Sequence, residues 1–328
     1  MHNSKMKKII SVLLVLAVSA GVFWALDFAL YPCTFMRNDI HSVCTKEVDD
    51  IYVGTSHGKM NIDPASMEEV SGRTGHNLCV GGEYSIDTYY MTKLLLEKGK
   101  KPSRIVYEVS PGYFTLQKEE GNNYLLFYHE FPMTMAKLEY FMDAIAPCNF
   151  RTSLFPWYEY PLSYELANLS DTISKKAAKD FGTEDLETES QKYHENGFIE
   201  RYPTDPATFT MKGLTEFHVE DVKEENVEYL KKLINLCKEN GIEFVAVTTP
   251  VPMPTLKKFS KGYNEAWDYF EDIFEEQNVP YINFNTKEYF KTVTHRVEDF
   301  TDLDGHMHGD AARMFSKTLA RVLDDVTQ

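Results

Sequence analysis

A serine near the start of this 328-residue chain stands in a setting that suits nucleophilic catalysis. Ser56 follows the apolar run 51–53 and Gly54 in the segment DDIYVGTSHGKM. This pattern predicts a buried strand, a tight turn and then a helical segment. A serine at the carboxyl end of such a strand lies where open α/β sheets bind their ligands. Backbone N–H groups of the turn could hold an oxyanion there, although many Gly-Thr-Ser turns have no such role.

A candidate partner for this serine lies near the C-terminus, in the segment FTDLDGHMHGDAARMF. His306 could take the proton of the Ser56 hydroxyl, because a neutral imidazole is a base at physiological pH. A carboxylate would orient this imidazole and stabilise its protonated form. Asp302 and Asp304 both precede His306 closely, and either could serve. Together these residues predict the triad of a hydrolase or acyltransferase.

Two further histidines, His57 and His308, stand beside the candidate triad. His57 is either a turn residue that bonds the backbone, or a group that binds substrate or replaces the base. His308 and His306 could bind a cation together with the nearby acids Asp302, Asp304 and Asp310. However, the five cysteines show no spacing typical of a metal site. We therefore expect neither a metal nor another cofactor.

Composition limits the classes of partner. Lys and Arg total 34 against 50 Asp and Glu, which gives a formal charge of −16. No basic stripe is present, so the sequence does not predict nucleic-acid binding. The apolar content of 43% suffices for the core of one large domain. In an exported protein, Cys33 and Cys44 could close a small disulfide.

The N-terminus predicts a membrane helix. Residues 5–8 read KMKK, and residues 9–26 carry no charge. A helix of that length spans roughly 27 Å, close to the bilayer core. Because lysines before such a helix stay in the cytoplasm, we expect a cytoplasmic basic tail at 1–8, a transmembrane signal-anchor at 9–31 and an extracytoplasmic domain at 32–328. Val18-Ser19-Ala20 would also suit a removed signal peptide, but the apolar stretch continues past that site and favours an uncleaved anchor.

Segments typical of strands and helices alternate along most of the remaining chain. Residues 115–220 interrupt this alternation and predict an inserted cap over the ligand edge of a sheet. The aromatic residues of this insertion either stack on sugar rings or form a core. The alternation itself is typical of parallel α/β sheets. The pattern predicts strands over 48–53, 77–82, 104–109, 242–250 and 280–284, and helices over 85–101, 221–240, 262–277 and 308–325.

Several of these blocks together resemble the SGNH hydrolase superfamily. They are GTSH followed by Ile-Asp-Pro, NL followed by a glycine pair, VYEVSP, VAVTTP, and finally FTD followed by HM and FS. The resemblance covers about residues 48–115 and 225–325. It is closest to the membrane-anchored branch that includes the lipoteichoic acid D-alanylation protein DltD and the alginate and cellulose O-acetylation proteins.

The resemblance implies a flavodoxin-like three-layer α/β/α fold. It also implies that Ser56 is the nucleophile, that His306 is the general base, and that Gly82 forms an oxyanion hole with the Ser56 N–H. For the acid, Asp302 keeps the usual Phe-x-Asp lead-in, whereas Asp304 fits an Asp-x-His spacing.

The third block departs from the family pattern, because it has no oxyanion asparagine. Glu108 and Ser110 stand there instead. Loss of one oxyanion donor costs on the order of 100- to 1000-fold in rate.

These features predict an extracytoplasmic, serine-dependent O-acyltransferase or esterase that modifies a cell-envelope polysaccharide or teichoic acid. The resemblance implies a membrane-bound O-acyltransferase as partner. One alternative is a non-catalytic accessory protein that binds glycan or that partner, and the missing asparagine motivates it. Another alternative is a DltD-like thioesterase, which would use the same triad on a carrier-bound acyl group.

Overall fold

Five parallel strands form the central sheet, in the order β2-β1-β3-β6-β7. The computed structural model describes residues 2–118, 124–148 and 168–326. The prediction of a parallel α/β fold is therefore confirmed. The strands are β1 (Asp50–Val53), β2 (Gly75–Asn77), β3 (Arg104–Glu108), β6 (Glu243–Thr248) and β7 (Tyr281–Asn283); β4 (Gln191–Tyr193) and β5 (Ile199–Arg201) form a separate antiparallel hairpin.

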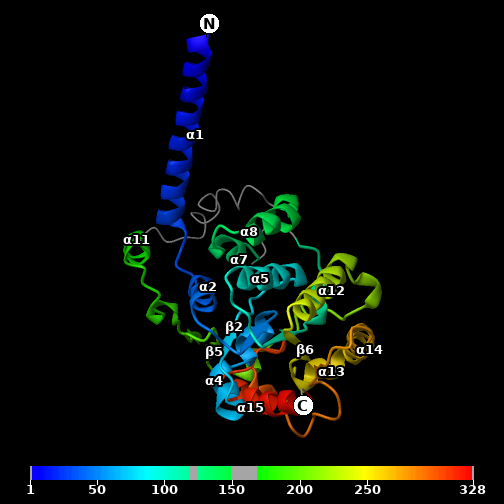
Figure 1. Ribbon diagram of the computed structural model, residues 1–328. Helices are drawn as coiled ribbons and strands as arrows, with labels where there is room; N and C mark the ends of the chain where they lie inside the picture. The colour runs from blue at the N-terminus through cyan, green and yellow to red at the C-terminus, as the bar shows by residue number, and fades with distance from the viewer. Residues whose placement is uncertain (1, 119–123, 149–167, 327–328) are drawn as a thin grey trace.

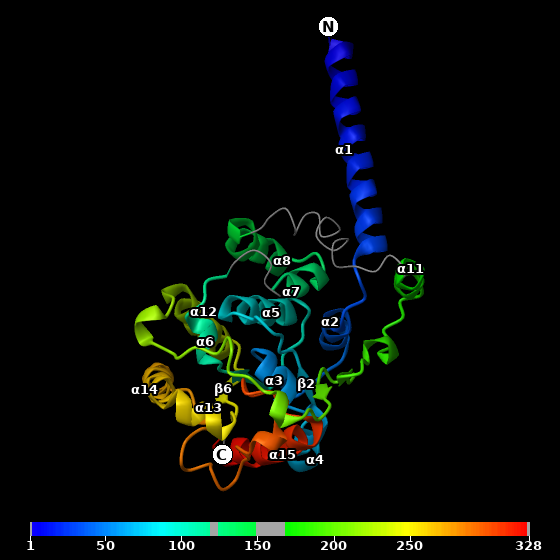
Figure 2. The ribbon, with the colours of Figure 1, turned by 180° about the vertical axis from the view of Figure 1, so that it is seen from behind.

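Helices cover both faces of the sheet, as Figure 1 and Figure 2 show. Ile51 and Val53 of β1 pack with the layer of α5 and α12, whereas Tyr52 packs with the layer of α15. This alternation follows from the two-residue period of a strand. The helices are α1 (His2–Leu30), α2 (Phe35–Thr45), α3 (Ser56–Asn61), α4 (Pro64–Ser71), α5 (Ser85–Glu97), α6 (Pro111–Phe114), α7 (Tyr124–Glu130), α8 (Met135–Tyr140), α11 (Leu169–Ala178), α12 (Glu224–Glu239), α13 (Met253–Lys258), α14 (Ser260–Glu276) and α15 (Gly309–Val326).

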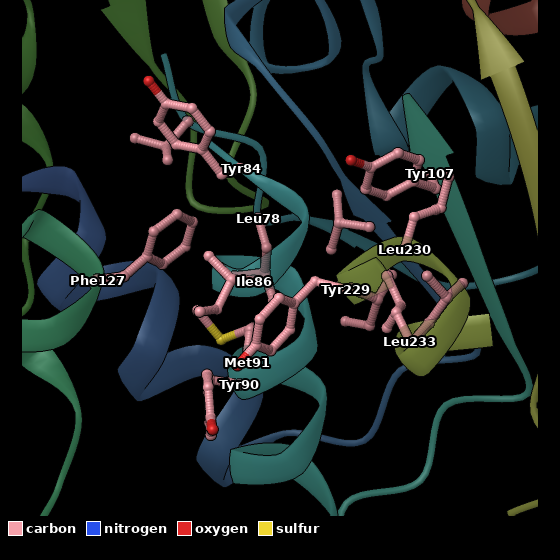
Figure 3. Close-up of a cluster of buried hydrophobic side chains, with 14 of the residues drawn as sticks. Leu78, Tyr84, Ile86, Tyr90, Met91, Tyr107, Phe127, Tyr229, Leu230 and Leu233 are labelled. Atoms are coloured by element: carbon pink, nitrogen blue, oxygen red, sulfur yellow. The ribbon is translucent and has the colours of Figure 1, made fainter. Parts of the chain in front are cut away.

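The larger core cluster lies on the α5–α12 side of the sheet. Figure 3 shows Ile86 and Met91 of α5 between Phe127 of α7 and Leu233 of α12, and all four side chains are buried. Burial of one such side chain contributes roughly 1.5–3 kcal/mol. This packing fixes the frame to which the loops at the sheet edge are attached.

The inserted segment 115–220 packs mainly against a helix layer. α7 and α8 contact α5, and the ring of Tyr140 stacks on Tyr90 of α5. The aromatic side chains around α7 and α8 thus form core, which is one of the two alternatives expected; they include Phe127, Tyr128, Phe131 and Tyr140. Trp157, Tyr158 and Tyr160 lie outside the described residues. Within the described part, residues 115–116 and the loop around 213–217 reach the large pocket at the sheet edge.

One predicted strand and one predicted disulfide need correction. β2 ends at Asn77 rather than at residue 82, although the Leu78 and Val80 N–H groups still bond β1 and its turn. Cys33 and Cys44 are free thiols. Cys33 stands two residues before α2 and Cys44 lies in its last turn, so nearly the whole helix, roughly 15 Å, separates them, too far for a disulfide.

The N-terminal helix projects away from the domain (Figure 1). Among the described residues, its segment Lys5–Leu30 is the one helix long and apolar enough to cross a membrane, by length and composition. Its base is attached to the insertion, because His129 Nε2 lies 2.8 Å from Asp27 Oδ1 and Lys176 donates to the Phe28 carbonyl at 2.8 Å. The orientation across a membrane and the domain bounds stay predictions.

A buried ionic cluster fastens α2 to the sheet domain. The Asp39 carboxylate receives hydrogen bonds from Lys59 at 2.7 Å, His76 at 2.8 Å and the Tyr193 hydroxyl at 2.6 Å. Burial would raise the pKa of the Asp39 carboxyl, but Lys59 and His76 hold this pKa below its usual value. Hydrogen bonds to this one buried carboxylate therefore join α2 to α3, β2 and β4.

We expect Asp39→Ala to lower the free energy of unfolding by about 3–5 kcal/mol, because it leaves the buried Lys59 ammonium without its carboxylate. Urea unfolding of the detergent-purified chain measures this loss. Glu276→Ala is the control, because it breaks an exposed pair with Lys231, which water and salt screen, and should leave stability nearly unchanged. Equal losses in the two variants would contradict this account of α2.

Candidate functional site: a hydrogen-bonded Ser–His–Asp row

The turn after β1 presents Ser56 at the carboxyl edge of the sheet. Gly54 has a φ of +132°, and a Cβ there would lie 2.6 Å from the Glu108 carbonyl oxygen. Only glycine fits this position. Thr55 then caps α3, since its Oγ1 accepts the His57 N–H at 3.3 Å. Ser56 is thus the first residue of α3, and its N–H is one of the first-turn amides that have no acceptor within the helix.

Ser56, His306 and Asp302 form one continuous hydrogen-bonded row. Ser56 Oγ lies 2.8 Å from His306 Nε2, and His306 Nδ1 lies 2.7 Å from Asp302 Oδ2. The carboxylate can only accept, so the imidazole proton is on Nδ1 and the lone pair of Nε2 faces the serine hydroxyl. This is the tautomer in which His306 can accept the Ser56 proton.

The structure pairs Asp302, and not Asp304, with His306. Asp302 Oδ1 also accepts the N–H groups of Asp304, Gly305 and His306, at 3.0, 3.0 and 3.2 Å. Burial would raise the pKa of the Asp302 carboxyl, but these bonds and the His306 contact lower it well below its usual range. Asp304 follows in the same loop, and its side chain points to His57 instead, with Asp304 Oδ1 3.8 Å from His57 Nε2. Of the two acids that the sequence allowed, Asp302 is therefore the one that orients His306, and Asp304 is not.

Asn61 holds the loop that carries His306. Its Oδ1 accepts the Met307 N–H at 2.8 Å, and its Nδ2 donates to the Gly305 carbonyl at 2.9 Å. These two bonds clamp the residues on either side of His306 to the end of α3, which begins with Ser56. No local pattern in the sequence indicates this role, because Asn61 and its partners lie far apart along the chain.

Glu108 and Ser110 stand where the family pattern has an oxyanion asparagine, but Glu108 cannot replace that asparagine as a donor. Glu108 Oε2 accepts the Thr55 N–H at 2.9 Å and the Thr55 hydroxyl at 2.7 Å, and its Oε1 accepts the Ser110 hydroxyl at 2.8 Å. A carboxylate is an acceptor only, so it cannot stabilise an oxyanion. Its contacts instead position the turn that carries Ser56.

A second buried acid, Glu83, supports the same turn. Its Oε2 accepts the Gly54 N–H at 2.9 Å, while its Oε1 has no hydrogen-bond partner. Burial, together with the nearby charges of Asp87 and Glu108, raises the pKa of the Glu83 carboxyl well above its usual value. Sequence reasoning missed Glu83, although it directly follows the glycine pair of the second block.

Gly82 lies in a loop that is bonded to the turn of Ser56 from both sides. The Val80 N–H donates to the Gly54 carbonyl, and Glu83 accepts the Gly54 N–H. Burial raises the pKa of the Tyr113 hydroxyl, and the neighbouring backbone of Gly82 opposes this rise. The oxyanion role of Gly82 stays a prediction.

The alternative of a cation site formed by His306, His308 and the nearby acids is not assembled as the sequence would allow. Asp310 pairs with Arg313 at 3.3 Å, and His308 Nε2 lies 3.9 Å from Asp299. Among the described residues, His57, Asp304 and His306 do bring ligand-type atoms within 4.8 Å of one another. His306 Nε2, however, is already bonded to Ser56.

A pocket of about 410 Å³ opens beside this row. His57 and Asp304 line it, together with the loop after β3, the end of β6, α13 and α14. It lies next to the triad histidine, because the rings of His57 and His306 are 4.7 Å apart. The row therefore has an adjacent chamber for part of a substrate.

Comparison with known proteins gives similarity in solved structures alone. No family model matches the sequence, and no curated protein matches it. A G-D-S-L family protein assigned as lipolytic, from Desulfitobacterium hafniense DCB-2, aligns at 9% identity and a TM-score of 0.38, over 84% of this chain and 99% of its own.

Two Bacteroides proteins align in the same way. One, from Bacteroides fragilis NCTC 9343, is assigned as an acylhydrolase and has 9% identity and a TM-score of 0.40, over 88% of this chain and 95% of its own. The other is a GDSL-like lipase from Bacteroides thetaiotaomicron VPI-5482, with 8% identity and a TM-score of 0.36, over 84% and 88%. TM-scores this low do not place the chain in a family, so the functional argument rests on its own residues.

We expect Glu83→Gln to flatten the pH dependence of stability. The folded-state pKa of Glu83 lies well above the unfolded value of 4.5, so folding takes up a proton and stability falls as pH rises above 4.5. Glutamine keeps an acceptor for the Gly54 N–H and stays neutral. Urea unfolding should therefore show that the difference in free energy of unfolding, variant minus wild type, grows between about pH 5 and about pH 8.

The exposed Glu239→Gln is the matched control and should leave the pH slope unchanged. A variant slope equal to that of wild type would show that Glu83 is ionised in the folded chain, contrary to this account.

Proposed function

We propose that this chain is a serine-dependent acyl hydrolase or acyltransferase of the SGNH type. The observation that carries the proposal is the row from Ser56 through His306 to Asp302, with contacts of 2.8 and 2.7 Å at the carboxyl edge of a parallel sheet. A nucleophile, a base in the right tautomer and a carboxylate that orients the base are the three parts that serine acyl transfer needs.

In the first step, Ser56 Oγ attacks the acyl carbonyl carbon while His306 Nε2 takes its proton. The bond from carbon to the leaving group then breaks, and His306 returns the proton to that group. The acyl group remains as an ester on Ser56. In the second step, water or an acceptor hydroxyl attacks this ester and gives its proton to His306, and Ser56 Oγ leaves and regains the proton.

Charge that develops in these steps has nearby partners. The Asp302 carboxylate, whose pKa is held low, stabilises the His306 imidazolium. The N–H groups of Ser56 and Gly82 are the oxyanion donors in this proposal. Since the third-block carboxylate of Glu108 is bonded to Thr55, it supplies no third donor.

We place the domain outside the cytoplasm, on a cell-envelope polysaccharide or teichoic acid. The lysines before α1 and the apolar window Lys5–Leu30 support a membrane anchor with the domain on the far side. A membrane-bound O-acyltransferase that supplies the acyl group is the partner implied by the sequence resemblance. A DltD-like thioesterase would use the same row and differ only in the acyl donor.

We expect Ser56→Ala and His306→Ala each to lower kcat for p-nitrophenyl acetate by on the order of 1000-fold or more, because the nucleophile or its base is removed. Release of p-nitrophenol by the detergent-purified chain measures the effect. A fluorophosphonate should label wild type and leave Ser56→Ala unlabelled, and Ser190→Ala, an exposed serine outside the site, is the control. A folded wild type with neither turnover nor labelling would indicate the non-catalytic accessory protein.

We also expect Asn61→Ala to lower kcat by about 10- to 100-fold with little change in KM, because the loop that holds His306 loses its clamp. Steady-state kinetics separates the two constants. Asn240→Ala removes a comparable side-chain bond, to the Leu236 carbonyl, away from the site and should behave as wild type. Equal kcat values in the two variants would remove Asn61 from the positioning of His306.

A further inference from the structure

A second hydrogen-bonded chain ends at His57, and the acyl chemistry above does not use it. His57 Nδ1 lies 2.9 Å from Ser110 Oγ. The Ser110 hydroxyl donates to one oxygen of Glu108, and the Thr55 hydroxyl donates to the other. The two hydroxyl oxygens also lie 2.8 Å from each other, but the carboxylate is the stronger acceptor, so we assign both hydroxyl protons to it. Ser110 Oγ is therefore the acceptor for His57 Nδ1–H, and the lone pair of His57 is on Nε2.

That lone pair faces no donor. His57 Nε2 is buried and forms no hydrogen bond. Its nearest charged neighbour is Asp304 Oδ1 at 3.8 Å, which is also an acceptor. A buried acceptor without a partner costs free energy, and two acceptors side by side call for a donor between or beside them. The arrangement is therefore complementary to a ligand that brings hydroxyl groups.

The pocket lined by His57 and Asp304 is also suited to a ligand that brings hydroxyl groups. Its wall carries five threonines as well as the aromatic rings of Tyr113, Phe217 and Tyr263. Hydroxyl and carboxylate groups can bond the hydroxyls of a sugar, while aromatic rings can cover its apolar faces. The Asp304 side chain is 52% exposed, so its rotation can admit a hydroxyl to Nε2.

We propose that this pocket is the acceptor site of acyl transfer, and that it binds a sugar or another polyol whose hydroxyls donate to His57 Nε2 and Asp304. This inference rests on the proposed function, because it needs an acyl group on Ser56. The ring centroids of His57 and His306 are 4.7 Å apart, so neighbouring hydroxyls of one polyol reach both rings. His57 holds one hydroxyl while the next one faces the base of the triad.

The transfer step balances without another reactant. The acceptor oxygen forms a bond to the acyl carbon, and the bond from that carbon to Ser56 Oγ breaks. The acceptor proton passes to His306 Nε2 and then to Ser56 Oγ. His57 keeps its proton on Nδ1 throughout, so it binds and orients the acceptor and does not act as the base.

The test is the partition of acyl-Ser56 between water and an added alcohol. The detergent-purified chain turns over p-nitrophenyl acetate with either glycerol or 1-propanol at equal hydroxyl concentration, and chromatography compares the new ester with free acetate. This product ratio is set after acylation, so a slower first step does not change it. Wild type should form more glycerol ester than propyl ester.

His57→Asn is the decisive variant, because asparagine can still donate towards Ser110 but offers nothing in place of Nε2. It should lower the ratio of glycerol ester to acetate by about 3- to 10-fold, as expected for the loss of one hydrogen bond. Ser110→Ala, which removes the acceptor for Nδ1–H, should shift this ratio in the same direction. His308→Asn is the matched control, and circular dichroism checks that each variant folds.

Three outcomes would overturn the inference. An unchanged ratio in both His57→Asn and Ser110→Ala would remove His57 from acceptor binding, and a preference for 1-propanol would make the pocket an apolar site. If EDTA alone brought the wild-type ratio down to that of His57→Asn, Nε2 and Asp304 would hold a cation instead of a hydroxyl. Failure of the proposed function is seen separately, as p-nitrophenol release that is absent or independent of Ser56.

Discussion

Two buried carboxyl groups hold the turn that follows β1, and every group around Ser56 depends on the position of that turn. Glu83 accepts the Gly54 N–H, and Glu108 accepts the Thr55 N–H and hydroxyl. Amides that would otherwise be unpaired at the end of a strand are thereby satisfied. Burial, together with the nearby charges of Asp87 and Glu108, raises the pKa of the Glu83 carboxyl well above its usual value, which favours its neutral form beside the second acid.

This support lets the turn carry a conformation that other sequences could not adopt. The positive φ of Gly54 places its backbone against Glu108, where no Cβ would fit. The same carboxylate then orders the Ser110 hydroxyl, and Ser110 orders the His57 ring. One acid therefore positions both the turn that carries Ser56 and a polar wall of the adjoining pocket.

The other half of the site comes from the end of the chain and is held by a different device. The Asp302 carboxylate gathers the N–H groups of the loop that follows it, which curls the loop so that His306 Nδ1 returns to the same side chain. Asn61 then ties this loop to α3, and α15 packs on α3 and α4 below. The distance from Ser56 to His306 is thus a consequence of the packing of the whole helical layer.

The region next to the N-terminal helix is organised by charge as well. Asp39 fastens α2 through three hydrogen bonds, and His129 binds Asp27 at the base of α1. The insertion contributes part of both attachments, since His129 belongs to α7 and Tyr193 to β4. The described aromatic side chains of its α7 and α8 pack in the core with α5. The insertion therefore mainly connects α1 and α2 to the sheet domain.

Local patterns in the sequence determined the parallel α/β class, the approximate strands and helices, and the two ends of the site at Ser56 and His306. Each depends on interactions within a few residues, such as the alternation of a strand or the spacing of apolar residues in a helix. Whether Asp302 or Asp304 pairs with His306 depends on how the loop that carries them folds. The roles of Asn61, Glu83, Glu108 and His57 needed partners that are remote in the chain. Only the tertiary structure decides such roles, because a side chain's hydrogen-bond partners are set by which strands and loops the core packing brings together.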